Sequence, residues 1–402
     1  MSAFRLTLWA VMALGQLTAW YFWQKRLKSL FLRSGIKTVY LLINVVTAAA
    51  VVQLYGLEII PADHFLWTVL YRPSLVWQFG HLMWLVLASG VWITSFLSRR
   101  WIYRQPRGLP RLFRAPRSGR PAFILVLLLW FLTLGLAGYA YSVQLQPARV
   151  RAYTLAYPDL PPRLEGLKIA HLSDLHYGLG TDQAELARRL AETAALSPDL
   201  ILITGDLIDT RASLARDWRE PLQSLARVPY GVYAVLGNHD LYTGNPAEES
   251  RIFESQGLTV LRNQLSNIPG LPLSLIGLDD PGTRSVFFRP DPNSAVLDFQ
   301  AVKGLPVPEG NFVILFRHRP QGLESAAQAG VSLYLAGHTH GGQFQTPWNS
   351  RWNLMSLSSD YTEGLYRHGP VSLIISNGLA AAGLPFRLWA WPEIGLITLT
   401  RG

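Results

Sequence analysis

Hydrophobic residues follow two different patterns along this chain of 402 residues. In the first third they form four long and nearly uncharged runs, at about residues 4–23, 36–57, 75–97 and 122–141. Each run is close to the roughly 20 residues that a helix needs to cross the hydrocarbon core of a membrane. The pattern therefore predicts four transmembrane helices within residues 1–141.

The loops between these runs carry very different numbers of basic residues. The first loop has four basic residues, and the third has eight arginines and no acid. The second loop has one basic and two acidic residues. Because Lys and Arg are retained on the cytoplasmic side of a membrane, the first and third loops are predicted to be cytoplasmic. We expect a multi-pass membrane protein with its C-terminal part on the extracytoplasmic side.

From residue 142 onwards the hydrophobic residues form short runs instead. Residues 142–164 are predicted to be a linker and a first strand, and residues 165–402 a separate domain. Its runs of strand length alternate with polar, helix-forming segments such as "TDQAELARRLAETAALS", which is typical of an α/β architecture. Ligands of open α/β sheets bind beyond the carboxyl ends of the strands. The residues that follow each run are therefore candidate site residues.

Five apolar runs are followed directly by residues that bind metals or transfer protons. The runs are "LKIAHL", "DLILIT", "YGVYAVL", "NFVILF" and "VSLYLA". Taken alone, each polar cluster is also compatible with a turn or a helix cap. Together the clusters predict one shared site, which contains Asp174, His176, Gly205, Asp206, Asn238, His239, Asp240, His318, His338 and His340.

The charge of the chain is divided unevenly between its two parts. The net charge is +10, but residues 1–141 have a balance of +13 and residues 142–402 one of −3. The second part therefore lacks the basic excess that binding to a phosphate backbone requires, and we expect no nucleic-acid partner. The chain has no cysteine, which excludes disulfides and thiolate metal ligands.

The ordered motifs resemble the signature of the calcineurin-like metallophosphoesterases. The set comprises Asp174-x-His176, Gly205-Asp206, Gly237-Asn238-His239-Asp240, His318 and Gly337-His338-x-His340. The flanking segments "GLKIAHLSDLHYG" and "SNGLAAAGLPFRLWAWPEIGLITL" are most similar to the YkuE-like bacterial branch, which is tethered to a membrane. The resemblance covers about residues 165–400. It implies a sandwich of two β-sheets flanked by helices.

The resemblance also implies a centre with two divalent metal ions. One ion would be held by Asp174, His176, Asp206 and His340, and the other by Asp206, Asn238, His318 and His338. Asp206 would thus contact both ions. Oxygen and imidazole ligands together favour Mn, Fe, Zn or Co over Mg or Ca.

Further residues are assigned roles beside the metals. His239 is the candidate general acid and Asp240 the candidate group that orients its ring; capping of the next segment by both is the alternative. Arg317 and Arg319 either bind a substrate phosphate or form ion pairs with acidic residues. Asn377 and Arg387 match the tail of the resembling branch and are candidates for lining the site.

The sequence therefore predicts a membrane-anchored dinuclear-metal phosphoesterase. The expected substrate is a phosphate ester, preferably a phosphodiester, of a lipid or cell-envelope molecule. One alternative is a lipid-nucleotide pyrophosphatase of the UDP-diacylglucosamine type. Another is an inert metal-binding membrane scaffold, although the complete ligand set argues against it.

Overall fold

The computed structural model describes residues 119–402, apart from 179–180, 210, 281–306, 358 and 384, and a few positions between 76 and 87. The chain divides into two compact units, Met1–Tyr141 and Ser142–Gly402. The second unit contains all the candidate site residues.

The predicted membrane location is contradicted by the helices of the structure. Helix α4, Gly119–Gln144, includes the fourth predicted span, residues 122–141. Within the part of the chain that is described, no helix meets the length and the apolar character that a membrane crossing requires. The predicted spans at residues 4–23 and 36–57, and most of the span at 75–97, lie outside the described residues.

The first of two six-stranded sheets has the strand order β1-β14-β2-β3-β4-β5. Strands β2 to β5 are parallel, β14 runs antiparallel to β2, and β1 pairs in parallel with β14 at the edge. The strands are β1 Arg149–Ala156, β2 Lys168–Leu172, β3 Leu200–Thr204, β4 Val232–Val235, β5 Leu258–Val260 and β14 Glu393–Thr400.

The second sheet has the order β12-β13-β9-β8-β7-β6, with antiparallel pairs only at its two edges. Its strands are β6 Gln264–Asn267, β7 Leu273–Leu278, β8 Phe312–Arg317, β9 Leu333–Ala336, β12 Gly364–His368 and β13 Val371–Ile375. A small antiparallel hairpin pairs β10, Gln345–Thr346, with β11, Asn349–Asn353.

The central strands are mostly apolar because both faces of each sheet are covered. Every residue of β3, β7, β8 and β9 is buried. Between the sheets, side chains such as Ile169 and Leu202 share one core with Phe316 and Leu335. Such continuous burial is expected for parallel strands with layers on both sides. The predicted sandwich is thus confirmed.

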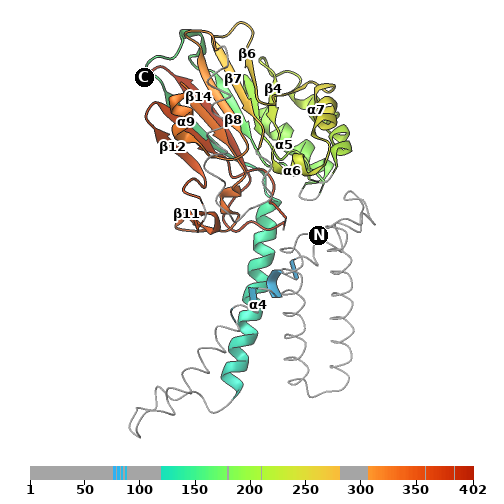
Figure 1. The fold of residues 1–402 in the computed structure, drawn as a ribbon. Helices are drawn as coiled ribbons and strands as arrows, with labels where there is room; N and C mark the ends of the chain where they lie inside the picture. The colour runs from blue at the N-terminus through green and yellow to red at the C-terminus, as the bar shows by residue number, and fades with distance from the viewer. Residues whose placement is uncertain are drawn as a thin grey trace. The chain divides into compact units, whose positions relative to one another are not determined.

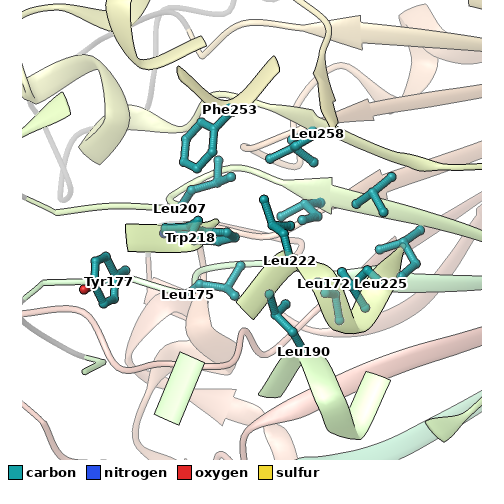
Figure 2. Close-up of a cluster of buried hydrophobic side chains, with 14 of the residues drawn as sticks. Leu172, Leu175, Tyr177, Leu190, Leu207, Trp218, Leu222, Leu225, Phe253 and Leu258 are labelled. Carbon is teal, nitrogen blue, oxygen red and sulfur yellow. The ribbon is translucent and has the colours of Figure 1, made fainter. Parts of the chain in front are cut away.

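Helices complete the layers on the outer faces of the two sheets. Helices α5, Gln183–Ala195, and α7, Pro246–Glu254, lie on one side in Figure 1, and α9, Leu323–Gln328, lies on the other. Figure 2 shows the cluster beneath the first group, where Trp218 and Phe253 pack near Leu190 and Leu222. The shorter helices are η3 Pro162–Leu164, η4 Ala212–Trp218, η5 Pro221–Leu225, α6 Asn238–Tyr242, η6 His340–Gly342 and η7 Leu354–Leu357.

Polar residues start the two longer helices of the first group. The side chain of Asp182 accepts a hydrogen bond from the backbone N–H of Glu185, and Asn245 does the same for Glu248. Each cap satisfies a backbone donor that the first helical turn leaves without a partner. These helix starts therefore follow directly from the sequence.

Candidate dinuclear metal centre

The candidate ligands lie on loops that follow five strands of the two sheets. Three loops, after β2, β3 and β4, belong to the first sheet, and two, after β8 and β9, belong to the second. The sandwich brings these loops together at one end. Six of the predicted ligands are buried and His338 is partly buried; the six are Asp174, His176, Asp206, Asn238, His318 and His340.

One group of ligand atoms gathers around His176. Its Nε2 atom lies 3.2 Å from Nε2 of His340 and 3.6 Å from Oδ2 of Asp206. Oδ1 of Asp174 lies 3.2 Å from Nε2 of His340. Asp174, His176 and His340 therefore offer three ligand atoms that lie within 4.8 Å of one another.

A second group gathers around His318. Its Nε2 atom lies 3.1 Å from Oδ2 of Asp206 and 3.2 Å from Nδ1 of His338. The Asp206 oxygen is therefore close to ligand atoms of both groups, 3.1 Å from one histidine and 3.6 Å from the other. This position is the one that a carboxylate shared by two ions requires.

The other ring nitrogen of three histidines contacts an oxygen atom outside the centre. Nδ1 of His318 lies 2.7 Å from the carbonyl oxygen of Thr204, and Nδ1 of His340 lies 2.8 Å from that of Ala380. Nδ1 of His176 lies 2.6 Å from Oδ1 of Asp209. A proton on each Nδ1 leaves Nε2 with a lone pair that faces the centre. Metal-binding histidines are commonly oriented in this way.

Two buried oxygen atoms test whether the site suits a cation. Oδ1 of Asp174 and Oδ1 of Asn238 are buried and have no hydrogen-bond partner among the described residues. Buried oxygens without a partner are costly unless a cation or water satisfies them. Divalent ions accept a carboxylate and an amide oxygen beside imidazole nitrogens. The donor set therefore fits the implied metals.

The backbone at the centre adopts a conformation that side chains disfavour. Five predicted ligands have a positive φ, between 46° and 69°: Asp174, His176, Asp206, His338 and His340. Each such residue costs on the order of 1–3 kcal/mol and persists only where the surrounding structure imposes it. Concentration of this strain on the ligands indicates a functional site.

Burial and neighbouring carboxylates shift the pKa values of two histidines of the centre in opposite directions. Burial lowers the pKa of His340 to about 3. Burial also acts to lower the pKa of His318, but the carboxylates of Asp206, Asp174 and Asp280 together outweigh it and raise this pKa to about 10. Carboxylates at the centre therefore stabilise positive charge beside them, as a cation site requires.

His239 lies beside the ligands and is held by a carboxylate that the sequence patterns did not single out. Its Nδ1 atom lies 2.8 Å from Oδ1 of Asp209, the oxygen that also contacts His176. Burial acts to lower the pKa of His239, but Asp206 and Asp209 raise it to about 9. Asp209 follows Asp206 by three residues in "GDLID", and this spacing is the signal that could have identified it.

Asp240, predicted to orient the His239 ring, makes its hydrogen bonds to the backbone. Its oxygens accept from the N–H groups of Leu207, Ile208 and Gly237 at 2.9, 3.0 and 2.7 Å. It thereby ties the loop after β3 to the loop after β4. Its charge also contributes to the raised pKa of His239.

The four candidate substrate residues are all buried. Nε of Arg319 donates to Oδ2 of Asp280 at 2.7 Å, and Arg317 is fully buried. The Arg387 guanidinium donates to the carbonyl of Asn377 and to Oε1 of Gln144. Asn377 lies against Gly341, where a Cβ atom would overlap its amide oxygen. Asn377 and Arg387 are thus both placed beside the loop of His340, since a terminal nitrogen of Arg387 lies 3.4 Å from Nδ1 of His340.

Two buried carboxyl groups, Asp240 and Glu249, lie side by side next to the loops after β3 and β4. Burial and the neighbouring Asp240 carboxylate raise the pKa of Glu249 to about 11, and the two groups share a hydrogen bond. Glu249 is therefore protonated at neutral pH. The folded state binds this proton more tightly than the unfolded chain, whose glutamates titrate near pH 4.3. The stabilisation is complete below that pH and is lost as the pH rises towards 11.

The Glu249→Gln variant should keep the hydrogen-bond donor without this pH dependence. As the pH rises from 5 to 9, the free energy of unfolding of the variant should therefore increase relative to that of wild type. The difference should grow by up to about 1.4 kcal/mol per pH unit. Chemical unfolding at several pH values measures the difference. Glu254→Gln, an exposed residue of the same helix, is the control. A difference that does not change with pH would contradict the protonated state of Glu249.

The motifs match a known family and two similar proteins. A family model described as calcineurin-like phosphoesterase matches residues 167–342, which contain all seven predicted ligands. The chain is 30% identical over 274 residues to the uncharacterized metallophosphoesterase YkuE of Bacillus subtilis, across 67% of this chain and 91% of that protein. It is also 30% identical over 304 residues to a Danio rerio protein described as a transmembrane protein with metallophosphoesterase domain. This match covers 72% of this chain and 67% of that protein.

Solved structures show weaker overall likeness. A dimetal phosphatase from Danio rerio aligns with a TM-score of 0.33 and 12% identity, across 54% of this chain and 88% of that one. A 5'-nucleotidase precursor from Thermus thermophilus aligns with a TM-score of 0.36 and 17% identity, across 58% and 54%.

Proposed function

Because this chain belongs to the calcineurin-like metallophosphoesterase family and is a metal-dependent phosphoesterase, we propose that it hydrolyses phosphodiesters of a lipid or cell-envelope molecule. The leaving group in this proposal is an alcohol. One observation carries it: His239 lies beside the gathered ligands, with Asp209 bound to its Nδ1 atom. The catalytic domain would comprise residues 165–402, and β1 of the preceding segment completes its first sheet.

When bound, two divalent ions neutralise the substrate phosphate and lower the pKa of an attacking water. Asp174, His176, Asp206 and His340 would hold one ion, and Asp206, Asn238, His318 and His338 the other. The protein residues supply the remaining chemistry, namely orientation of the ligands and transfer of a proton.

His239 provides the proton that an alcohol needs in order to leave. An alkoxide is a poor leaving group, so its oxygen must be protonated as the bond to phosphorus breaks. Asp209 accepts a hydrogen bond from Nδ1–H of His239, and the Nε2 proton of the imidazolium remains available for transfer. Burial acts to lower the pKa of His239, but Asp206 and Asp209 raise it, and Asp209 is not one of the metal ligands, so it favours the imidazolium also when metals are bound.

The charge balance beside the centre favours a diester over a monoester. A monoester at neutral pH carries up to two negative charges, whereas a diester carries one. The Arg319 guanidinium is already paired with Asp280, and Arg387 donates to oxygens of the protein itself. These contacts reduce the positive charge offered to a second phosphate oxygen anion.

The full-length chain, supplied with Mn²⁺, should therefore hydrolyse bis(p-nitrophenyl) phosphate faster than p-nitrophenyl phosphate. Release of nitrophenol at matched concentrations measures both rates. Activity confined to the monoester would contradict the diesterase proposal. Absence of activity on both esters with metals bound would favour the inert scaffold instead.

Asp209→Asn should lower both metal affinity and turnover, because the variant loses the negative charge that orients His176 and His239. Substitutions of such partners of metal ligands typically cost about 10- to 100-fold. Asp217→Asn is a matched control. That carboxylate also accepts a side-chain hydrogen bond, from Tyr177 at 2.8 Å, but it is not a partner of His176 or His239. Metal titration and turnover of an alkyl phosphodiester are the two measurements. Unchanged values for both would show that Asp209 has no part in the site.

A further inference from the structure

Three large apolar side chains are strongly exposed within one short segment of the catalytic unit. Trp348, Trp352 and Leu357 are 75%, 64% and 85% exposed. Other large apolar side chains exposed in the described part of residues 142–402 reach at most 47%, at Val150. Single exposed apolar residues are normal, but a gathering of them commonly marks a binding surface. We call residues 348–357 the tryptophan segment.

The tryptophan segment is attached to the loop that carries two of the metal ligands. It starts at the turn between β10 and β11 and continues into η7. Asn353, at the end of β11, packs so closely on Gly342 that a Cβ atom there would overlap its amide. Gly342 is two residues from His340. The apolar segment is therefore anchored directly beside the centre.

Hydrogen bonds within the tryptophan segment, and one beside it at β10, hold this part of the chain in its shape. The Asn353 amide donates to the carbonyl of Ser350 at 2.9 Å and accepts from the backbone N–H of Ser356 at 3.1 Å. The backbone N–H of Gln345 donates to the carbonyl of Leu388 at 2.9 Å. The exposed side chains thus project from a fixed support, which reduces the entropy lost when a ligand binds.

The charge of this region indicates what kind of group it would accept. Residues 343–359 contain a single charged side chain, Arg351, and no acid. The Arg351 guanidinium lies 4.9 Å from the centre of the Tyr366 ring and donates to the carbonyl of Leu365. An apolar surface with one cation complements an alkyl chain joined to an anionic group. A polyanion such as a nucleic acid would need several cations.

We propose that Trp348, Trp352 and Leu357 bind the alkyl chain of an amphiphilic phosphodiester whose phosphate occupies the metal centre. This inference rests on the proposed phosphodiesterase function and specifies its substrate class. A strand rises about 3.3 Å per residue, so Trp348 lies roughly 16 Å along the hairpin from Asn353. A long alkyl chain on the phosphate can extend over such a distance, whereas a methyl group is too short to reach the tryptophan segment.

The test compares two p-nitrophenyl phosphodiesters that carry a methyl or an octyl group on the oxygen that is retained. Both are used below the concentration at which the octyl ester forms micelles. Each buried methylene changes binding by about fourfold. For the full-length chain, we expect kcat/KM for the octyl ester to exceed that for the methyl ester at least about 10-fold, mainly through KM.

The variant with Trp348→Ser, Trp352→Ser and Leu357→Ser should bring this ratio close to one. Val150→Ser, at an exposed apolar position on β1, should keep the wild-type ratio. Thermal unfolding of both variants checks that they fold. A wild-type ratio near one, or a ratio unchanged by the triple substitution, would overturn the proposal. The proposal would also be overturned if the triple variant differed from wild type only in its oligomeric mass, measured by light scattering. The exposed surface would then bind a second copy of the chain.

Competitive binding of octyl phosphate and inorganic phosphate to the metal-loaded chain separates this proposal from the proposed function. Tighter binding of octyl phosphate that is lost in the triple variant supports the alkyl site even if neither ester is hydrolysed. In that case the phosphodiesterase function alone fails. Equal binding of both phosphates overturns the alkyl site, whatever the rate of hydrolysis.

Discussion

Asp206→Asn should abolish phosphoesterase activity and lower the bound metal below that of wild type. Oδ2 of Asp206 lies within 3.6 Å of ligand nitrogens of both groups, and Oδ1 accepts the backbone N–H of His239 at 2.8 Å. Asparagine has the same shape, but its NH₂ group cannot bind a cation and its charge is zero. The loss should exceed the roughly 10³-fold effect of removing one electrostatic contact to a transition state.

Asp279→Asn is the matched control for this substitution. That carboxylate forms an ion pair with Arg262 at 2.8 Å and contacts none of the ligands in the described structure. Metal content per chain and turnover of a phosphodiester should both match wild type in the control. Full activity of Asp206→Asn, or of wild type after exhaustive chelation, would contradict the shared carboxylate.

His239→Ala should retain its metals and its fold while losing activity in a manner that depends on the leaving group. The expected loss on an alkyl phosphodiester is about 10²- to 10⁴-fold, the range of general acid catalysis. A nitrophenyl ester should lose far less, because nitrophenolate leaves without a proton. The geometry favours this role, since Nδ1 of His239 is fixed by Asp209 and the side chain is 26% exposed to solvent, unlike the buried ligands beside it.

The alternative role of His239, as a structural residue of helix α6, has a different outcome. A structural loss would lower the unfolding temperature and reduce the two rates equally. His368→Ala, at an exposed histidine of β12, controls for the loss of an imidazole. Equal losses on both esters with metal content intact would exclude the general-acid role.

The strands that position the site could be predicted because burial leaves a direct pattern. Strands buried on both faces appear as continuous apolar runs, as β3 and β8 do, and the site residues follow at their ends. The pairing could not be predicted in this way. Strand β14 comes from the end of the chain and lies between β1 and β2, and hydrophobic pattern does not specify such long-range partners. The sandwich itself followed from the family resemblance.

The roles of individual carboxylates depended on contacts that a sequence does not reveal. Asp240 adjoins His239 in the chain, yet its oxygens accept three backbone N–H groups. Asp209 is thirty residues away and reaches both His176 and His239, because the loops after β2, β3 and β4 meet. Glu249 lies in a helix pattern that gives no sign of a buried acid. The predicted membrane location was contradicted because, among the residues that the structure describes, no helix is long and apolar enough to cross a membrane.

The number of metal ions per chain, measured together with activity, tests the central claim most directly. The full-length protein is stripped of metal, Mn²⁺ is added stepwise, and bound metal and phosphodiester hydrolysis are followed in the same samples. The two-ion centre predicts that activity reaches its maximum only at two ions per chain, and that Asp206→Asn does not reach this state. Full activity at one ion per chain, or without metal, would contradict it.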